Sequence, residues 1–151
     1  MTAANNTHSI VVGYLLWLFG FTGSHRFYYG KPLTGTLWFF TLGLLGIGWL
    51  IDLFLIPSMD AAADRRYRQG RYDYSVAWIL LTFLGPFGLH RMYLGKWVSG
   101  MVFLLVALAT GSLALIFWPL IGLFILFVVV AMVYDFCTLN EQIDQRNRSF
   151  D

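Results

Sequence analysis

Two histidine–arginine pairs carry the side chains of this chain that are best suited to chemistry. His25 and Arg26 form the first pair, and His90 and Arg91 form the second, 65 positions further along. A protein-bound zinc ion needs three or four ligands, whereas the surroundings of each pair offer one histidine and at most one aspartate. Neither histidine is spaced from a nucleophilic side chain as a hydrolase would require. We therefore expect no catalytic residue, no metal site and no cofactor.

Two aspartates are the only acids within apolar segments, and each follows one of these pairs. Asp52 and Asp135 would be costly as ionised groups deep in hydrocarbon, so they should face protein, water or the membrane interface. Both lie near the ends of their segments, which also allows simple escape to the interface. Because arginine binds carboxylates with bidentate geometry, we hypothesise that Asp135 pairs with Arg91. The same reasoning pairs Asp52 with Arg26 only if residues 33–56 fold back on themselves.

The pairs belong to a longer pattern, Gly-x-x-Gly-x-His-Arg-x-Tyr-x-Gly-Lys, that the chain carries twice in the same register. Each copy lies between apolar segments. The shared residues are Gly20, Gly23, His25, Arg26, Tyr28, Gly30 and Lys31 in the first copy and Gly85, Gly88, His90, Arg91, Tyr93, Gly95 and Lys96 in the second. The glycines are expected to be structural, because glycine permits tight turns and close approach of helices.

This repeated pattern resembles the TM2-domain family, and the resemblance covers nearly the whole chain as two tandem repeats. It implies an integral membrane protein and no particular reaction. Many animal members of the family carry Asp-Arg-Phe where this chain has His25, Arg26 and Phe27, and the second copy has Met92 in place of the aromatic residue. A partner contact that needs the acid and the aromatic ring together is therefore not expected. The motif residues, with Asp52 and Asp135, should be structural or bind a partner.

The arginines and aromatic residues of the motif are expected mainly at the membrane interface. Arginine can extend its charge to the headgroups, so Arg26 and Arg91 should anchor their loops there, with recognition of a partner or a lipid as the alternative. Phe27, Tyr28 and Tyr93 could lie at headgroup level beside them.

The composition also indicates a membrane protein. Hydrophobic residues make up 58% of the 151 residues, charged residues 12%, and the mean hydropathy is +0.67. An ordinary soluble domain has about a quarter of its residues charged. The ten lysines and arginines lie between or after apolar segments, so they act as topology signals rather than as a nucleic-acid surface. Cys137 is the only cysteine, which excludes a disulfide within the chain.

The apolar segments predict an all-α, multi-pass protein with about five membrane spans. Residues 10–24 have neither the basic leader nor the cleavage site of a signal peptide, so we expect a retained helix. The segment 33–56 is long enough to cross once, and Pro57 should end it. The segment 97–136 is too long for one span and should break at Thr110, Gly111 and Ser112 into helices at about 97–109 and 113–136.

A different arrangement of residues 33–56 is also possible. Gly43, Gly46 and Gly48 could form the tip of a re-entrant hairpin, which would keep Asp52 beside its own His-Arg loop and reduce the count to four spans. We favour the single crossing, because its span lengths are conventional and the uncharged N-terminus suits translocation. The N-terminus and linker would then face outside, and the His-Arg loops would face the cytoplasm.

The predicted organisation is a first repeat at 8–57, a polar linker at 58–73, a second repeat at 74–140 and a polar tail at 141–151. The expected function is non-enzymatic: a structural or regulatory module that contacts the lipid bilayer and packs with other membrane proteins or with itself. A small oligomeric channel or transporter is the alternative, and it would require a continuous polar face across a span. Nucleic acid is not an expected partner. The small size and the lack of a large soluble part favour a bacterial inner membrane.

Overall fold

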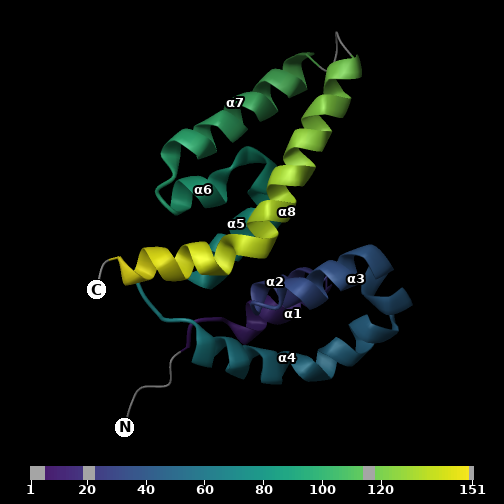
Figure 1. Cartoon of the computed structure of the whole chain (residues 1–151), viewed down its shortest axis with the longest axis vertical. Coiled ribbons are helices and arrows are strands. Elements are labelled where there is room, and N and C mark those ends of the chain that lie inside the picture. The colour runs from purple at the N-terminus through teal and green to yellow at the C-terminus, as the bar shows by residue number, and fades with distance from the viewer. Residues whose placement is uncertain (1–5, 19–22, 114–117, 150–151) are drawn as a thin grey trace. The chain divides into compact units, whose positions relative to one another are not determined.

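The computed structural model of the chain describes residues 6–18, 23–113 and 118–149, and all regular elements within them are helical (Figure 1). The all-α prediction is therefore confirmed for the described residues. The elements are α1 (Ile10–Leu18), α2 (Ser24–Tyr28), α3 (Pro32–Leu45), α4 (Ile47–Arg66), α5 (Tyr74–Leu84), the short 3₁₀ helix η1 (Gly85–Phe87), α6 (Leu89–Tyr93), α7 (Trp97–Leu113) and α8 (Trp118–Arg148).

The helices form two compact units. Unit 1 comprises Met1–Val76 and Leu139–Asp151, and unit 2 comprises Ala77–Thr138. The residues expected as a polar tail are thus helical up to Arg148, and they belong to unit 1 as the last turns of α8.

In unit 1, α3 and α4 form a helical hairpin instead of one continuous helix. The backbone turns left-handed over the last residues of α3 and at the Gly46 that follows, with φ of 50° at Leu42, 53° at Leu44 and 56° at Leu45, and φ of 67° and 85° at Gly43 and Gly46. A run of left-handed residues cannot continue a right-handed helix, so the chain reverses there. The prediction that 33–56 crosses as a single helix is wrong, and the structure shows the alternative hairpin.

Helix α4 also continues through Pro57, which was expected to end the segment. Ile56, Met59 and Ala63 are buried at helical spacing on both sides of the proline. A proline inside a helix costs about 3 kcal/mol, and we attribute its tolerance here to the packing of this buried stripe.

In unit 2, α7 passes through the predicted break and ends at Leu113. Thr110 lies inside this helix and donates its hydroxyl hydrogen bond to the carbonyl of Val106, at 2.7 Å. The turn that leads to α8 lies outside the described residues. Among those described, one segment, Ile125–Arg148, is long and apolar enough to cross a membrane unaided. The shorter apolar helices are Pro32–Leu45, Tyr74–Phe87 and Trp97–Thr110.

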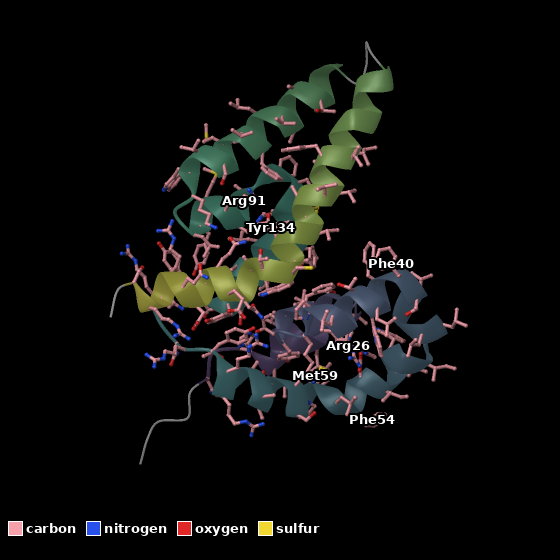
Figure 2. All side chains as sticks on the ribbon, viewed as in Figure 1. Arg26, Phe40, Phe54, Met59, Arg91 and Tyr134 are labelled. Atoms are coloured by element: carbon pink, nitrogen blue, oxygen red, sulfur yellow. The ribbon has the colours of Figure 1, made fainter. Side chains whose placement is uncertain are left out.

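The hairpin of unit 1 presents large apolar side chains on its outer surface. Phe40 on α3 and Phe54 on α4 are 78% and 80% exposed, and they project away from the hairpin in Figure 2. Leu45 at the tip is 89% exposed. Soluble proteins rarely expose so much contiguous apolar surface, whereas a helix that faces lipid does so.

Candidate functional site

The first candidate cluster joins the His-Arg loop to α4. The Nε2 atom of His25 lies 2.7 Å from Oδ2 of Asp52, and Nε of Arg26 donates to the same oxygen at 2.7 Å. The Nη2 group of Arg26 donates to the other oxygen, Oδ1, so the arginine holds the carboxylate at both oxygens. His25 and Asp52 are fully buried and Arg26 is 7% exposed. The pairing that was conditional on a hairpin in residues 33–56 is therefore present, together with that hairpin.

The second cluster repeats this chemistry in unit 2 with a looser geometry. His90 Nε2 lies 2.8 Å from Oδ2 of Asp135, and both Nε and Nη2 of Arg91 approach that same oxygen at 2.8 Å. The predicted pair of Asp135 with Arg91 is thus confirmed. The Arg91 side chain is 17% exposed, compared with 9% for Arg26, so the second cluster is the more open of the two.

Each arginine also lies over an aromatic ring that sequence reasoning missed. The guanidinium carbon of Arg26 is 3.6 Å from the centre of the Trp38 ring, and that of Arg91 is 4.4 Å from the centre of the Phe103 ring. Such contacts add a cation–π attraction to the ion pair. Trp38 and Phe103 are 65 positions apart, the offset of the repeat, and this spacing could have identified them.

Two pairs of glycines allow α2 and α6 to lie close to the helices that follow them. Gly23 and Gly88 precede these helices with φ of 81° and 70°, which L-residues adopt at a cost. A Cβ atom at Gly88 would lie 2.6 Å from Cβ of Phe103 and 2.9 Å from the carbonyl oxygen of Gly100. In the first repeat, a Cβ atom added at Gly35 would lie 2.8 Å from Cδ2 of Phe27. Glycine is therefore needed on both sides of each contact, at Gly23 and Gly35 in the first repeat and at Gly88 and Gly100 in the second.

The other predicted motif residues form the turns around these helices. The Gly30 and Gly95 amides donate to the carbonyls of Phe27 and Met92, both at 2.9 Å, and the amides of Lys31 and Lys96 donate to the carbonyls of Arg26 and Arg91 at 2.9 Å. Gly85 is buried at the start of η1, Tyr93 ends α6, and Gly20 lies outside the described residues.

In unit 1 the motif side chains expected to face lipid headgroups are instead enclosed by the protein. Tyr28 is completely buried, Phe27 is 7% exposed, and Arg26 is enclosed with its carboxylate. The reason is tertiary packing: the Tyr28 hydroxyl accepts from the Ser9 amide at 2.6 Å and bonds the Ser75 hydroxyl at 2.8 Å. These residues build the interior of unit 1.

Burial of His8 is a feature that sequence reasoning missed. Its ring lies among the rings of Tyr74, Tyr28 and Tyr67, with centroids 4.6, 4.8 and 5.5 Å away. The preceding Thr7 bonds His8 Nδ1 through its hydroxyl at 2.8 Å. Burial lowers the pKa of His8 from 6.5 to about 4. No local sequence signal marks this cluster, because its tyrosines come from three separate parts of the chain.

The N-terminal segment and α8 both close the polar end of unit 1. Oδ1 of Asp64 on α4 accepts hydrogen bonds from the Thr7 amide and hydroxyl, both at 2.8 Å. From α8, Nδ2 of Asn140 donates to the carbonyl of Tyr28 at 2.7 Å and to that of Phe27 at 3.2 Å.

The N-terminus, the first His-Arg loop and the start of the linker therefore meet at one end of unit 1. Nη1 of Arg66 donates to the Gly30 carbonyl at 3.1 Å, so the end of α4 lies beside that loop. The expectation that the linker and this loop face opposite sides of the membrane is wrong, because the hairpin returns the chain to its starting end.

The two clusters are chemically closed. In each cluster, an arginine and a histidine side chain bind the oxygens of a buried carboxylate. Among the described residues, no three histidines, cysteines or acids gather closely enough to hold a metal ion. The arrangement favours locking of the backbone over proton transfer to a substrate.

Comparison with known proteins identifies a family. The model of the TM2 domain matches residues 6–54 and 70–130. A TM2 domain-containing protein of Dictyostelium discoideum is 50% identical over 60 residues, which is 39% of this chain and 39% of the relative. Another from that organism is 50% identical over 57 residues, 37% of this chain and 42% of the relative.

The similarity extends to mammals. TM2 domain-containing protein 1 of Homo sapiens is 50% identical over 52 residues, 34% of this chain and 25% of the relative. The chain thus spans less than half the length of each of these three relatives. No solved structure matches.

Proposed function

This chain belongs to the TM2-domain family of membrane proteins, and we propose that it is a multi-pass protein in which two tandem TM2 repeats form a non-enzymatic structural or regulatory module. The observation that carries this proposal is the burial of both His-Arg-Asp clusters. The most chemically capable side chains of the motif are engaged with one another and hold each repeat together. A buried carboxylate that loses its arginine is left uncompensated, so such clusters select one backbone arrangement.

We further propose that α3 and α4 enter the membrane as a re-entrant hairpin. The right-handed part of helix α3 runs from Pro32 to the residue before Leu42 and is about 15 Å long, shorter than a hydrocarbon core of about 30 Å. Helix α7 has 17 residues, about 25 Å, so the hairpin of the second repeat reaches deeper. This proposal replaces the five conventional spans expected from hydropathy.

Cysteine labelling tests the arrangement of the first repeat. In a Cys137→Ser background, single cysteines at Lys31 and Arg68 are treated with a membrane-impermeant maleimide on sealed vesicles. A re-entrant hairpin places both sites on one side, so both label or both are protected, and permeabilisation exposes the protected pair. Labelling of one site with protection of the other would support the single crossing of 33–56.

As partners we propose the lipid bilayer and other membrane proteins or a second copy of the chain. The exposed apolar surface of the hairpin supports packing within the membrane. Two differently tagged full-length chains, coexpressed and extracted in mild detergent, test self-association by capture of one tag and detection of the other. Identification of co-purified membrane proteins tests the hetero-partner. Ion flux through proteoliposomes that contain the purified chain would instead support the channel alternative.

The proposed location is a cell membrane. The finer expectation of a bacterial inner membrane rests on the small size of the chain and stays a prediction, since the relatives described above are eukaryotic.

A further inference from the structure

Unit 2 has an open depression in which its positive charges meet an apolar wall. The depression has a volume of about 660 Å³, and its lining includes Arg91, Lys96, Trp97, Val102, Phe103 and Phe127. The sequence of residues 77–138 contains only three charged side chains, and two of them, both cationic, line this depression. The third, Asp135, is 1% exposed. The two cationic side chains of unit 2 are therefore gathered in one place.

We propose that this depression binds the headgroup of an anionic phospholipid. The guanidinium of Arg91 (labelled in Figure 2) is fixed between Asp135 and the Phe103 ring, so a partly exposed side chain is held in place before the lipid arrives. Lys96 adds a second positive charge at the same rim. Asp135 offsets the charge of Arg91, so Lys96 supplies the net positive charge that a phosphodiester anion complements, while the exposed part of the Arg91 guanidinium can donate to the phosphate.

The apolar part of the depression suits the remainder of a lipid molecule. Trp97 is 62% exposed at the rim, and tryptophan is enriched at the level of lipid headgroups. Val102 and Phe127 are 46% and 43% exposed along the wall, where acyl chains could lie. A zwitterionic headgroup would bring its own ammonium toward Arg91 and Lys96, so an anionic lipid such as phosphatidylglycerol should be preferred.

The first repeat supplies a matched control for this site. Lys31 occupies the position equivalent to Lys96, so its replacement removes the same charge from the same place in the motif. The neighbouring Arg26 is more enclosed than Arg91 and engages both carboxylate oxygens. We expect the headgroup preference to depend on Lys96 and not on Lys31.

The test uses the full-length chain in phosphatidylcholine vesicles that contain a minority of phosphatidylglycerol. Electron spin resonance of spin-labelled forms of the two lipids measures the relative affinity of the protein for each. Lys96→Gln should reduce the selectivity for phosphatidylglycerol about fivefold, the factor that corresponds to about 1 kcal/mol per basic residue. Lys31→Gln should leave it unchanged. Val102→Trp, which fills the depression and keeps every charge, should reduce the selectivity as Lys96→Gln does.

Two results would overturn the proposal. Equal losses in Lys96→Gln and Lys31→Gln would mean that overall charge, not the depression, selects the lipid. Full selectivity in Val102→Trp would mean that the lipid does not enter. The inference rests on the proposed membrane residence, but the failure of each gives a different spectrum. A chain that does not insert into the bilayer slows the motion of neither spin-labelled lipid. A chain that inserts but lacks the site slows the motion of both lipids equally. Circular dichroism of each variant establishes that it is folded.

Discussion

The hydrogen-bonded pair of Arg26 and Asp52 should be one of the strongest energetic couplings in the molecule. The perturbation is a double-mutant cycle that comprises Arg26→Gln, Asp52→Asn and the double substitution. Each single change leaves one buried group of the ion pair without its charged counterpart, because the carboxylate is fully buried and the arginine side chain is 9% exposed; His25 still bonds Asp52 after Arg26→Gln. The double change removes both charges at once.

The geometry sets the expected magnitudes. Removal of one partner from a buried ion pair costs about 3–5 kcal/mol, so each single variant should lose about that much stability. The double variant should lose much less than the sum, with a coupling of about 2–3 kcal/mol. The equivalent cycle on Arg91 and Asp135 should give roughly 1 kcal/mol, because Arg91 is 17% exposed, can turn to water, and contacts a single carboxylate oxygen.

The assay is reversible unfolding of the full-length chain in mixed detergent micelles, followed by circular dichroism. Arg65→Gln is the control, since Arg65 is an exposed arginine on α4 and its loss should change stability by less than about 0.5 kcal/mol. Strict additivity at Arg26 and Asp52 would refute the pair and, with it, the hairpin that brings the two residues together.

Three further predictions use the same unfolding measurement. Leu45→Gly should stabilise the chain by about 1 kcal/mol, because φ at this position is 56° and the side chain is 89% exposed; a loss would contradict the left-handed turn. Gly88→Ala should destabilise it by at least about 2 kcal/mol, since the new Cβ would combine a φ of 70° with a 2.6 Å approach to Phe103; a neutral result would contradict that packing. The wild type should lose about 3 kcal/mol of stability relative to His8→Gln as the pH falls from about 6.5 to about 4, because burial lowers the pKa of His8 to about 4 and the unfolded chain takes up the proton first. Burial raises the pKa of Asp60 to about 6, so Asp60 stabilises the fold as the pH falls, but it does so equally in both proteins. Parallel pH profiles of the two proteins would exclude a buried His8.

Most of the candidate site could be predicted from the constant spacing of 65 residues between the two repeats. Counting 65 positions from His25 and Arg26 identifies their equivalents in the second copy, and the acid downstream of each pair identifies the carboxylate. Burial of Asp135 against Arg91 followed from the cost of an unpaired carboxylate in hydrocarbon. The pair of Asp135 and Arg91 could be predicted from this chemistry alone, whereas the pair of Asp52 and Arg26 also depended on the path of residues 33–56.

The path of the backbone was harder to predict, because packing overrode local preferences. Leu42, Leu44 and Leu45 are typical of a membrane span, and hydropathy does not reveal that they turn left-handed. Pro57 is an ordinary helix terminator, yet α4 continues through it. Burial of His8 requires tyrosines from positions 28, 67 and 74 to converge, which no local pattern indicates.

The contact between Asn140 and the first His-Arg loop sets an order of events during synthesis. The side chain that satisfies the carbonyl of Tyr28 is added 112 residues after it, when most of the chain has already left the ribosome. Domains usually fold as they emerge, N-terminal first. Here the first repeat cannot complete its hydrogen bonds until Asn140 has been added and has left the ribosome. A ribosome stalled before Leu139 would hold a nascent chain with a complete first motif, in which the Tyr28 carbonyl lacks its bond from Asn140 while the Phe27 carbonyl already accepts from the Gly30 amide.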